Sequence, residues 1–296
     1  MIVGIGELLW DVYPDGRKVA GGAPFNFAFH CQQLGHEAAI VSRVGDDELG
    51  RELREEVKRL GISDEFIQTD RDHPTGTVRV TVDDGGQPSY EIVEDVAWDY
   101  IEWGPSLDLL KLRAIALCFG TLASRHPITR ETVEQIISPW TRGADPKVIV
   151  CDINLRQTGP NSDFISSAIG GSDWVKLNEG ELKAITEPSR MWSGAIEPTI
   201  DHFFSNHVVI VTRGSKGCIV SHNGEHFHEP PVPARVVDTV GAGDAFTAAM
   251  VCLHLEGRSL QECARFANHY AARVCEHQGG TPRIDRADVE RACFES

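Results

Sequence analysis

The feature that most constrains the fold of this chain is a repeated alternation of short apolar runs with longer helical patterns. The runs after residue 113 are residues 114–119, 148–151, 174–177 and 208–212, and helical stretches separate them. Strands that are apolar throughout are typical of parallel sheets covered by helices on both faces. We therefore predict an α/β fold with a doubly wound, mainly parallel sheet flanked by helices.

The N-terminal part of the chain continues this alternation. The apolar run 2–5 precedes a helical pattern over 24–34 that opens with proline, and the run 38–41 precedes apolar residues at helical spacing that stop before Gly61. Two more long helices are predicted over 242–255 and 260–274. We expect one domain that spans residues 1–296.

One segment departs from the βα alternation. Residues 77–82 and 89–93 have the period-two pattern of strands, and the residues between them are rich in turn formers, which predicts a β-hairpin. A hairpin inserted between βα units can cover the mouth of a site as a lid, although an extra edge of the main sheet is the alternative. We expect residues of about 10–20 and 75–101 to contribute lid strands. If the chain forms a homodimer, we expect the contact at the lid.

Composition narrows the function classes. The chain has 296 residues, 41% of them hydrophobic, with a net charge of −16 and no Lys/Arg-rich run, so nucleic acid is not an expected partner. No stretch approaches the length of a membrane span, and the first residues lack the pattern of a secretory leader, so we expect a cytoplasmic protein without a membrane partner. The eight cysteines form no C-x-x-C pair and are expected to be reduced.

Polar side chains follow several of the predicted strands. In doubly wound sheets ligands bind beyond the carboxyl ends of the strands, so these positions are candidates for a site. They are Glu7, Asp11, Asp152, Asn154, Arg156, Lys176, Asn178, Glu181, Thr212, Arg213 and Gly214.

The run Asp238-Thr-Val-Gly-Ala-Gly-Asp244 stands at the start of the predicted helix 242–255. Its small residues Gly241, Ala242 and Gly243, which we call the anion-binding run, leave the amides of a helix N-terminus uncovered, and such amides attract a phosphoryl group. Asp244 is placed to accept the proton of a hydroxyl that attacks the phosphorus. Helix capping is the alternative for this aspartate, but its neighbours favour catalysis.

The sequence DTVGAGDAF, which begins at Asp238, resembles the second motif of the ribokinase-like, PfkB-type family of carbohydrate kinases. A second segment, Gly21-Gly-Ala-Pro-Phe-Asn26, is similar to the family's glycine pair followed by an asparagine. The resemblance covers essentially the whole chain and implies the ribokinase-like fold and ATP-dependent, magnesium-assisted phosphorylation of a sugar. It further implies that Gly22 lets the sugar approach the backbone and that Asn26 and Asp11 form hydrogen bonds with the hydroxyls of the sugar.

The chain contains no G-x-x-x-x-G-K-[ST] sequence, which excludes a P-loop kinase, so ATP must be held in another way. The resemblance implies that Asn178 and Glu181 lie near the phosphates, with Glu181 holding Mg²⁺ through water. Both residues also fit a capping box, and the two roles can coexist. The resemblance places Thr212 and Gly214 along the phosphates and ribose of ATP, and Asn268 against adenine.

A monovalent cation is a further expectation from the resemblance. The family often uses a potassium-type ion beside the anion-binding run, and Asp238 with the loop 275–283 is the candidate site. No His/Cys spacing indicates zinc, and the histidines at 222, 226 and 228 are expected on the surface.

The substrate is indicated by the segment Asp152-Ile-Asn-Leu-Arg156, which resembles the D-P-N-x-R element of the fructokinase-like branch, with Ile153 in place of proline. The GGAP form of the N-terminal motif points the same way, so fructose is the leading candidate. Arg156 could contact ATP or a sugar phosphate, or form only a surface ion pair. Trp98 is an expected substrate contact from the lid. Ribose, 2-keto-3-deoxygluconate, phosphorylated sugars and nucleosides stay open, and a non-catalytic sugar sensor is the competing class.

Overall fold

The computed structural model describes residues 1–82, 88–138, 148–155, 162–189, 192 and 194–294. Within these residues the main sheet has nine strands, which are β1 (Ile2–Ile5), β4 (Ala38–Gly45), β5 (Ile67–Asp70), β8 (Ala116–Gly120), β9 (Val148–Asp152), β10 (Trp174–Asn178), β11 (Val208–Thr212), β12 (Cys218–His222) and β13 (Glu225–Glu229). Their order is β13-β12-β11-β10-β9-β8-β1-β4-β5. All neighbours from β5 to β11 run parallel, and β12 and β13 add an antiparallel edge.

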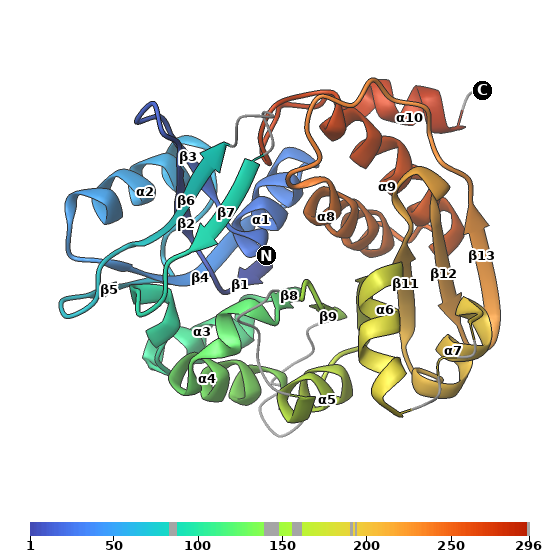
Figure 1. The fold of residues 1–296 in the computed structure, drawn as a ribbon, viewed down its shortest axis with the longest axis horizontal. Coiled ribbons are helices and arrows are strands. Elements are labelled where there is room, and N and C mark those ends of the chain that lie inside the picture. Colours follow the sequence, from blue (N-terminus) through green and yellow to red (C-terminus); the bar gives the residue numbers. More distant parts are fainter. Residues whose placement is uncertain (83–87, 139–147, 156–161, 190–191, 193, 295–296) are drawn as a thin grey trace.

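Helices cover both faces of this sheet (Figure 1). They are α1 (Ala23–Gln33), α2 (Glu48–Arg59), α3 (Pro105–Arg113), α4 (Pro127–Ile137), α5 (Ser162–Gly170), α6 (Glu179–Thr186), α7 (Ile196–Phe203), α8 (Ala242–Leu255), α9 (Leu260–Cys275) and α10 (Arg286–Phe294), with short 3-10 turns η1 (Ala97–Tyr100), η2 (Leu122–Arg125), η3 (Glu187–Ser189) and η4 (Gly214–Lys216). Alternate residues of one strand enter different cores. Ile2 packs with α1, α2, α8 and α9, whereas Val3 packs with α3 to α7. The predicted doubly wound fold is thus confirmed.

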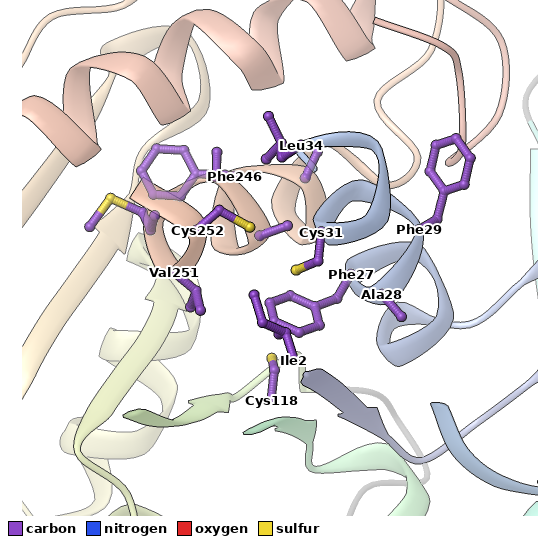
Figure 2. Close-up of a cluster of buried hydrophobic side chains, with 14 of the residues drawn as sticks. Ile2, Phe27, Ala28, Phe29, Cys31, Leu34, Cys118, Phe246, Val251 and Cys252 are labelled. Atoms are coloured by element: carbon purple, nitrogen blue, oxygen red, sulfur yellow. The ribbon is translucent and has the colours of Figure 1, made fainter. Parts of the chain in front are cut away.

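Helices α1 and α8 lie side by side on one face of the sheet. Figure 2 shows Phe27 of α1 next to Ile2 of β1, with Cys31 of α1 and Cys252 of α8 close by. The residues of α8 that face this core include fully buried alanines at 245, 248 and 249, which let the two helices approach closely. This packing brings the start of α1 beside the start of α8.

A second, small sheet holds the predicted hairpin. Its strands are β2 (Leu9–Val12), β3 (Lys18–Gly21), β6 (Gly76–Val82) and β7 (Pro88–Ile92), in the order β3-β2-β6-β7. The hairpin β6–β7 therefore pairs with β2 and does not extend the main sheet, which excludes the edge-strand alternative. Residues 97–100, which lie inside the segment proposed for lid strands, form the turn η1.

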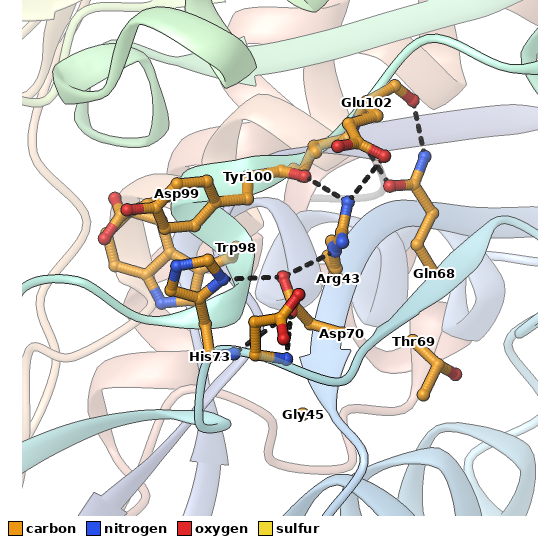
Figure 3. Close-up of polar contacts among 12 residues, drawn as sticks. Arg43, Gly45, Gln68, Thr69, Asp70, His73, Trp98, Asp99, Tyr100 and Glu102 are labelled. Carbon is orange, nitrogen blue, oxygen red and sulfur yellow. Dashed lines mark hydrogen bonds and ion pairs between the residues drawn. The ribbon is translucent and has the colours of Figure 1, made fainter.

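A polar cluster at the end of β4 and β5 fixes the chain on both sides of the β6–β7 hairpin (Figure 3). The buried carboxylate of Asp70 lies 2.8 Å from Arg43 Nε and 3.1 Å from His73 Nδ1, and it accepts hydrogen bonds from the amides of Asp72 and His73. Burial alone would raise the pKa of Asp70, but these partners outweigh it and lower the pKa. The His73 ring stacks on Tyr100 at 3.6 Å, so the segments before β6 and after β7 are tied together.

All eight cysteines are free thiols, and all but Cys275 are buried, in agreement with the sequence expectation. Burial raises the pKa of Cys31 and Cys118 well above the ordinary value, so these thiols stay protonated and unreactive. Among the helices that the structure describes, none has the length and apolar character that a membrane crossing requires.

Candidate active site

The first turn of α8 carries the residues predicted to act on a phosphoryl group. The helix begins at Ala242, and its N-cap, Gly241, has a left-handed backbone with φ of 74°. This conformation favours glycine because a Cβ would meet the following carbonyl. Glycine is also required by space, since a Cβ on Gly241 would lie 2.4 Å from Gly280 Cα. As a glycine, the N-cap residue has no side chain that could cap this helix start.

Asp244 and Asn26 meet although they are 218 positions apart in the sequence. Asn26 Nδ2 donates a hydrogen bond of 2.8 Å to Asp244 Oδ2, and only 5% of Asn26 is exposed. The two helix starts packed together by the core of Figure 2 create this contact. The asparagine thus orients the carboxylate of Asp244.

Two cavities meet at the anion-binding run. One, of about 380 Å³, is bounded by the start of α1, the small sheet and Asp244, and we call it the acceptor cavity. The other, of about 560 Å³, lies between the segment after β13, η4, α8 and α9, and we call it the donor cavity. Thr239 and Gly243 line both cavities. A group transferred between ligands in the two cavities would therefore pass this run.

The acceptor cavity gathers the three predicted sugar ligands Asp11, Gly22 and Asn26. Gly22 has φ of 115°, and a Cβ there would lie 2.2 Å from the carbonyl oxygen of Glu7, so no other residue fits without moving the backbone. Burial raises the pKa of Asp11 to about 6, and the negative charge of Asp238 adds to the shift. Asp11 is thus a group of this cavity that titrates within about one pH unit of neutrality.

This shift predicts a pH dependence of acceptor binding. If Asp11 holds the hydroxyls of an acceptor as a carboxylate, kcat/KM for that acceptor should fall about tenfold per pH unit below the pKa of about 6 and level off above it. The measurement is kcat/KM of the free enzyme between pH 4.5 and 9, about the range in which such groups titrate. Asp11→Asn should lower the plateau and remove this inflection. An inflection that persists in the variant would assign the titration to another group.

The donor cavity contains Thr212, Gly214 and Asn268, as predicted for the nucleotide side. Its other lining residues are mainly small or apolar and include Pro231, Val232, Ala271 and Ala272. Asn268 Nδ2 donates to the carbonyl of Pro230 at 3.2 Å, which fixes its amide at the cavity wall. A slot of this kind, apolar with a few polar groups, suits a planar base.

Asn178 and Glu181 form the capping box that the sequence allowed. Glu181 N donates to Asn178 Oδ1 at 2.9 Å, and Asn178 N donates to Glu181 Oε2 at 2.8 Å. The other carboxylate oxygen accepts from Leu155 N at 2.9 Å. Burial raises the pKa of Glu181, and the Asn178 amide opposes the shift. Neither Asn178 nor Glu181 lines the two cavities. Each carboxylate oxygen of Glu181 has a second lone pair, which could accept a hydrogen bond from the water shell of a magnesium ion.

Asp238 lies beside the loop predicted to complete a cation site. Its Oδ2 accepts from Gly279 N at 2.9 Å and its Oδ1 from Val240 N at 3.1 Å. The amides of Val237 and Asp238 both donate to the carbonyl of Cys275. Within the part of the chain that the structure describes, no group of three or more His, Cys, Asp or Glu side chains is placed to hold a metal.

One predicted substrate contact, Trp98, is not brought to the acceptor cavity. Trp98 has no exposed surface and packs with Val96 and Leu122, because η1 turns its side chain into a small core beneath the hairpin. The aromatic residue of the hairpin that lines the acceptor cavity is instead Tyr90 of β7. Arg156 lies outside the described residues.

Asp152 and Lys176 are candidate residues from the sequence, but their buried ion pair beneath the anion-binding run was not predicted. Lys176 Nζ lies 3.0 Å from both carboxylate oxygens of Asp152, and a Cβ on Gly243 would lie 3.0 Å from the same nitrogen. Thr247 Oγ1 donates to Asp152 Oδ2 at 3.2 Å. Burial lowers the pKa of Lys176, but the charges of Asp152 and Asp244 more than compensate and raise it. The signal was a lysine within the otherwise apolar strand β10, which needs a partner when buried.

The chain is similar to several known proteins. Residues 13–286 match the family model described as pfkB family carbohydrate kinase. A sugar kinase of Pyrococcus horikoshii is 31% identical over 310 residues, which cover 96% of this chain and 94% of that protein. Its structure in complex with ATP superimposes with a TM-score of 0.81 over 98% of this chain and 97% of that chain. A probable fructokinase of Arabidopsis thaliana is 27% identical over 318 residues, covering 96% and 93% of the two chains.

Proposed function

The chain belongs to the pfkB family of carbohydrate kinases, and from that premise we propose that it transfers the γ-phosphoryl group of ATP to a hydroxyl of a ketose, with fructose as the first candidate. The Pyrococcus relative solved with ATP supports the phosphoryl donor. The fructokinase relatives of Arabidopsis and of Klebsiella pneumoniae, at 27% and 28% identity, support the acceptor.

The observation that carries this proposal is the position of Asp244 where the acceptor and donor cavities meet, with Asn26 bonded to its carboxylate. A ketose in the acceptor cavity, held by Asp11, presents a primary hydroxyl to Asp244. The carboxylate takes the hydroxyl proton while the oxygen bonds to the γ-phosphorus and the bond from that phosphorus to the β-phosphate oxygen breaks. The products are ADP and a sugar phosphate.

The backbone amides of the anion-binding run, at the start of α8, stabilise the negative charge on the transferred phosphoryl group. The ammonium of Lys176 adds a fixed positive charge directly beneath Gly243. When bound, Mg²⁺ neutralises negative charge on the ATP phosphates, and Glu181 would hold the ion through water. Asp238 and carbonyls of the loop 275–283 would hold a monovalent cation.

Other acceptors are the alternatives within this proposal. Relatives named ribokinase, from Arabidopsis, and fructoselysine 6-kinase, from Escherichia coli, are 29% and 25% identical to this chain. Ribose, 2-keto-3-deoxygluconate and nucleosides therefore belong in any substrate test. A non-catalytic sugar sensor would be expected to lose the base or the glycines, whereas Asp244, Gly241 and Gly243 are all present.

The test is ADP release with ATP, Mg²⁺ and a panel of fructose, ribose, mannose, 2-keto-3-deoxygluconate, fructose phosphates and nucleosides. We expect kcat/KM for fructose to exceed that for ribose by at least about tenfold, since a misplaced or missing hydroxyl leaves polar groups unpaired. Reactions without sugar correct for ATP hydrolysis. A higher kcat/KM for another sugar would make that sugar the proposed substrate in place of fructose. The absence of turnover with every compound would overturn the kinase proposal.

A further inference from the structure

We propose that His30 is a positioning residue for the anion-binding run, which it holds in place through the main-chain carbonyl of Gly280. The inference rests on the proposed phosphoryl transfer and adds a residue that touches neither substrate. His30 lies on α1, one turn after Asn26, and none of its surface is exposed. Its Nε2 is 2.9 Å from the carbonyl oxygen of Gly280, and its Nδ1 is 3.1 Å from the hydroxyl of Tyr270 on α9.

The partners of His30 fix its tautomer. A carbonyl oxygen can only accept, so Nε2 carries the proton and donates it to Gly280. The Tyr270 hydroxyl then donates to Nδ1, and its oxygen accepts from Gln33 Nε2 at 2.7 Å. Burial lowers the pKa of His30 to about 4, so the ring stays neutral near pH 7. The result is one directed chain of donors from Gln33 through Tyr270 and His30 to Gly280.

Gly280 transmits this restraint to the site by direct backbone contact. A Cβ on Gly241 would lie 2.6 Å from Gly280 O, the same oxygen that accepts from His30. A Cβ on Gly280 would lie 2.8 Å from Asn26 Nδ2, whose own hydrogen bond orients Asp244. A shift of the Gly280 carbonyl therefore displaces both the left-handed glycine at the helix start and the asparagine beside the base.

The loop that contains Gly280 is held by α1 at a second point. Gln33 donates to the carbonyl of Pro282 at 3.2 Å and accepts from the amide of Ile284 at 2.9 Å. These bonds secure the far end of the loop, so the chain stays folded when His30 changes. The hydrogen bond of His30 goes to the oxygen that faces Gly241, whereas those of Gln33 go to the far end of the loop, and this separates the two roles.

Two variants of His30 distinguish positioning from packing. The amide nitrogen of glutamine occupies a place close to that of histidine Nε2, so His30→Gln should keep the donor to Gly280, whereas the shorter His30→Asn should lose it. We expect kcat of His30→Gln within about threefold of wild type. We expect His30→Asn to lose about 10- to 100-fold in kcat, with KM for sugar and ATP changed less than about threefold, because misplaced amides weaken transition-state binding.

Tyr270→Phe is the matched control, since it disrupts the same buried network without touching Gly280. It should lower the melting temperature about as much as His30→Asn but reduce kcat by less than about threefold. Equal kcat values for the two His30 variants, or a loss in Tyr270→Phe as large as in His30→Asn, would overturn the positioning proposal.

A spectroscopic measurement tests the network independently of turnover. Long-range proton–nitrogen NMR spectra of the ¹⁵N-histidine-labelled protein at pH 7 should assign the neutral Nε2–H tautomer to His30. An Nδ1–H or doubly protonated ring would overturn the proposal even in an active enzyme. Failure of the wild-type protein to phosphorylate any sugar would instead overturn the proposed function, and the NMR result would still decide whether His30 donates to Gly280.

Discussion

Asp244→Asn is expected to lower kcat by about 10³-fold, within the range that general-base catalysis contributes. Asparagine has the same shape, and its carbonyl oxygen can still accept the hydrogen bond from Asn26 Nδ2 that is 2.8 Å long in the wild type. The variant therefore removes the proton acceptor without removing the contact. KM for sugar and ATP should change only a few-fold, and steady-state ADP release measures both parameters.

Glu48→Gln provides the control for this substitution. Glu48 is an exposed acidic residue that, like Asp244, lies in the first turn of a helix, but it lines neither cavity. Its loss should cost at most about 1 kcal/mol of stability and leave kcat unchanged. Turnover of Asp244→Asn within tenfold of wild type would remove Asp244 as the base, while the family assignment would stand.

Among the substitutions proposed for this chain, Lys176→Met is expected to lower the free energy of unfolding most, by about 3–5 kcal/mol. The substitution leaves the carboxylate of Asp152, which is 4% exposed, without the ammonium group that now lies 3.0 Å from both of its oxygens. Thr247 can satisfy only one of these oxygens. Chemical denaturation monitored by circular dichroism measures the change.

The double variant Lys176→Met with Asp152→Asn should recover much of the lost stability, because the neutral amide no longer requires a counter-charge. A surface pair in the same chain offers the comparison. Arg258→Met breaks the exposed pair with Glu262 on α9 and should cost less than about 1 kcal/mol. Similar losses for Lys176→Met and Arg258→Met would show that the buried pair is not a stabilising unit of this fold.

Local signals in the sequence predicted most of the fold and much of the site. The apolar runs located the parallel strands, and proline and glycine marked the ends of α1 and α2. The anion-binding run was found because glycines before a helix have a direct physical meaning. Six of the predicted residues line the two cavities because strand ends and helix starts share one edge of the sheet; they are Asp11, Gly22, Asn26, Thr212, Gly214 and Asn268.

The failures concern the direction in which side chains point. Trp98 was expected at the substrate because it lies near the hairpin, but the turn η1 directs it into a core. The proposed role of His30 could not be predicted from the sequence, because its partners Tyr270 and Gly280 are more than 200 positions away along the chain. A pattern shows which residues share an element, whereas pairing across elements depends on packing that a single sequence does not encode locally.

The contact between Asn26 and Asp244 across 218 positions has a consequence for synthesis in the cell. At about 5–20 residues per second, a ribosome needs roughly 10–40 seconds to make the intervening chain. Throughout that interval the apolar face of α1 lacks α8, the helix that covers it in the finished protein. The nascent N-terminal half is therefore expected to be a chaperone client, and a chain that terminates before residue 242 is expected to aggregate instead of binding sugar.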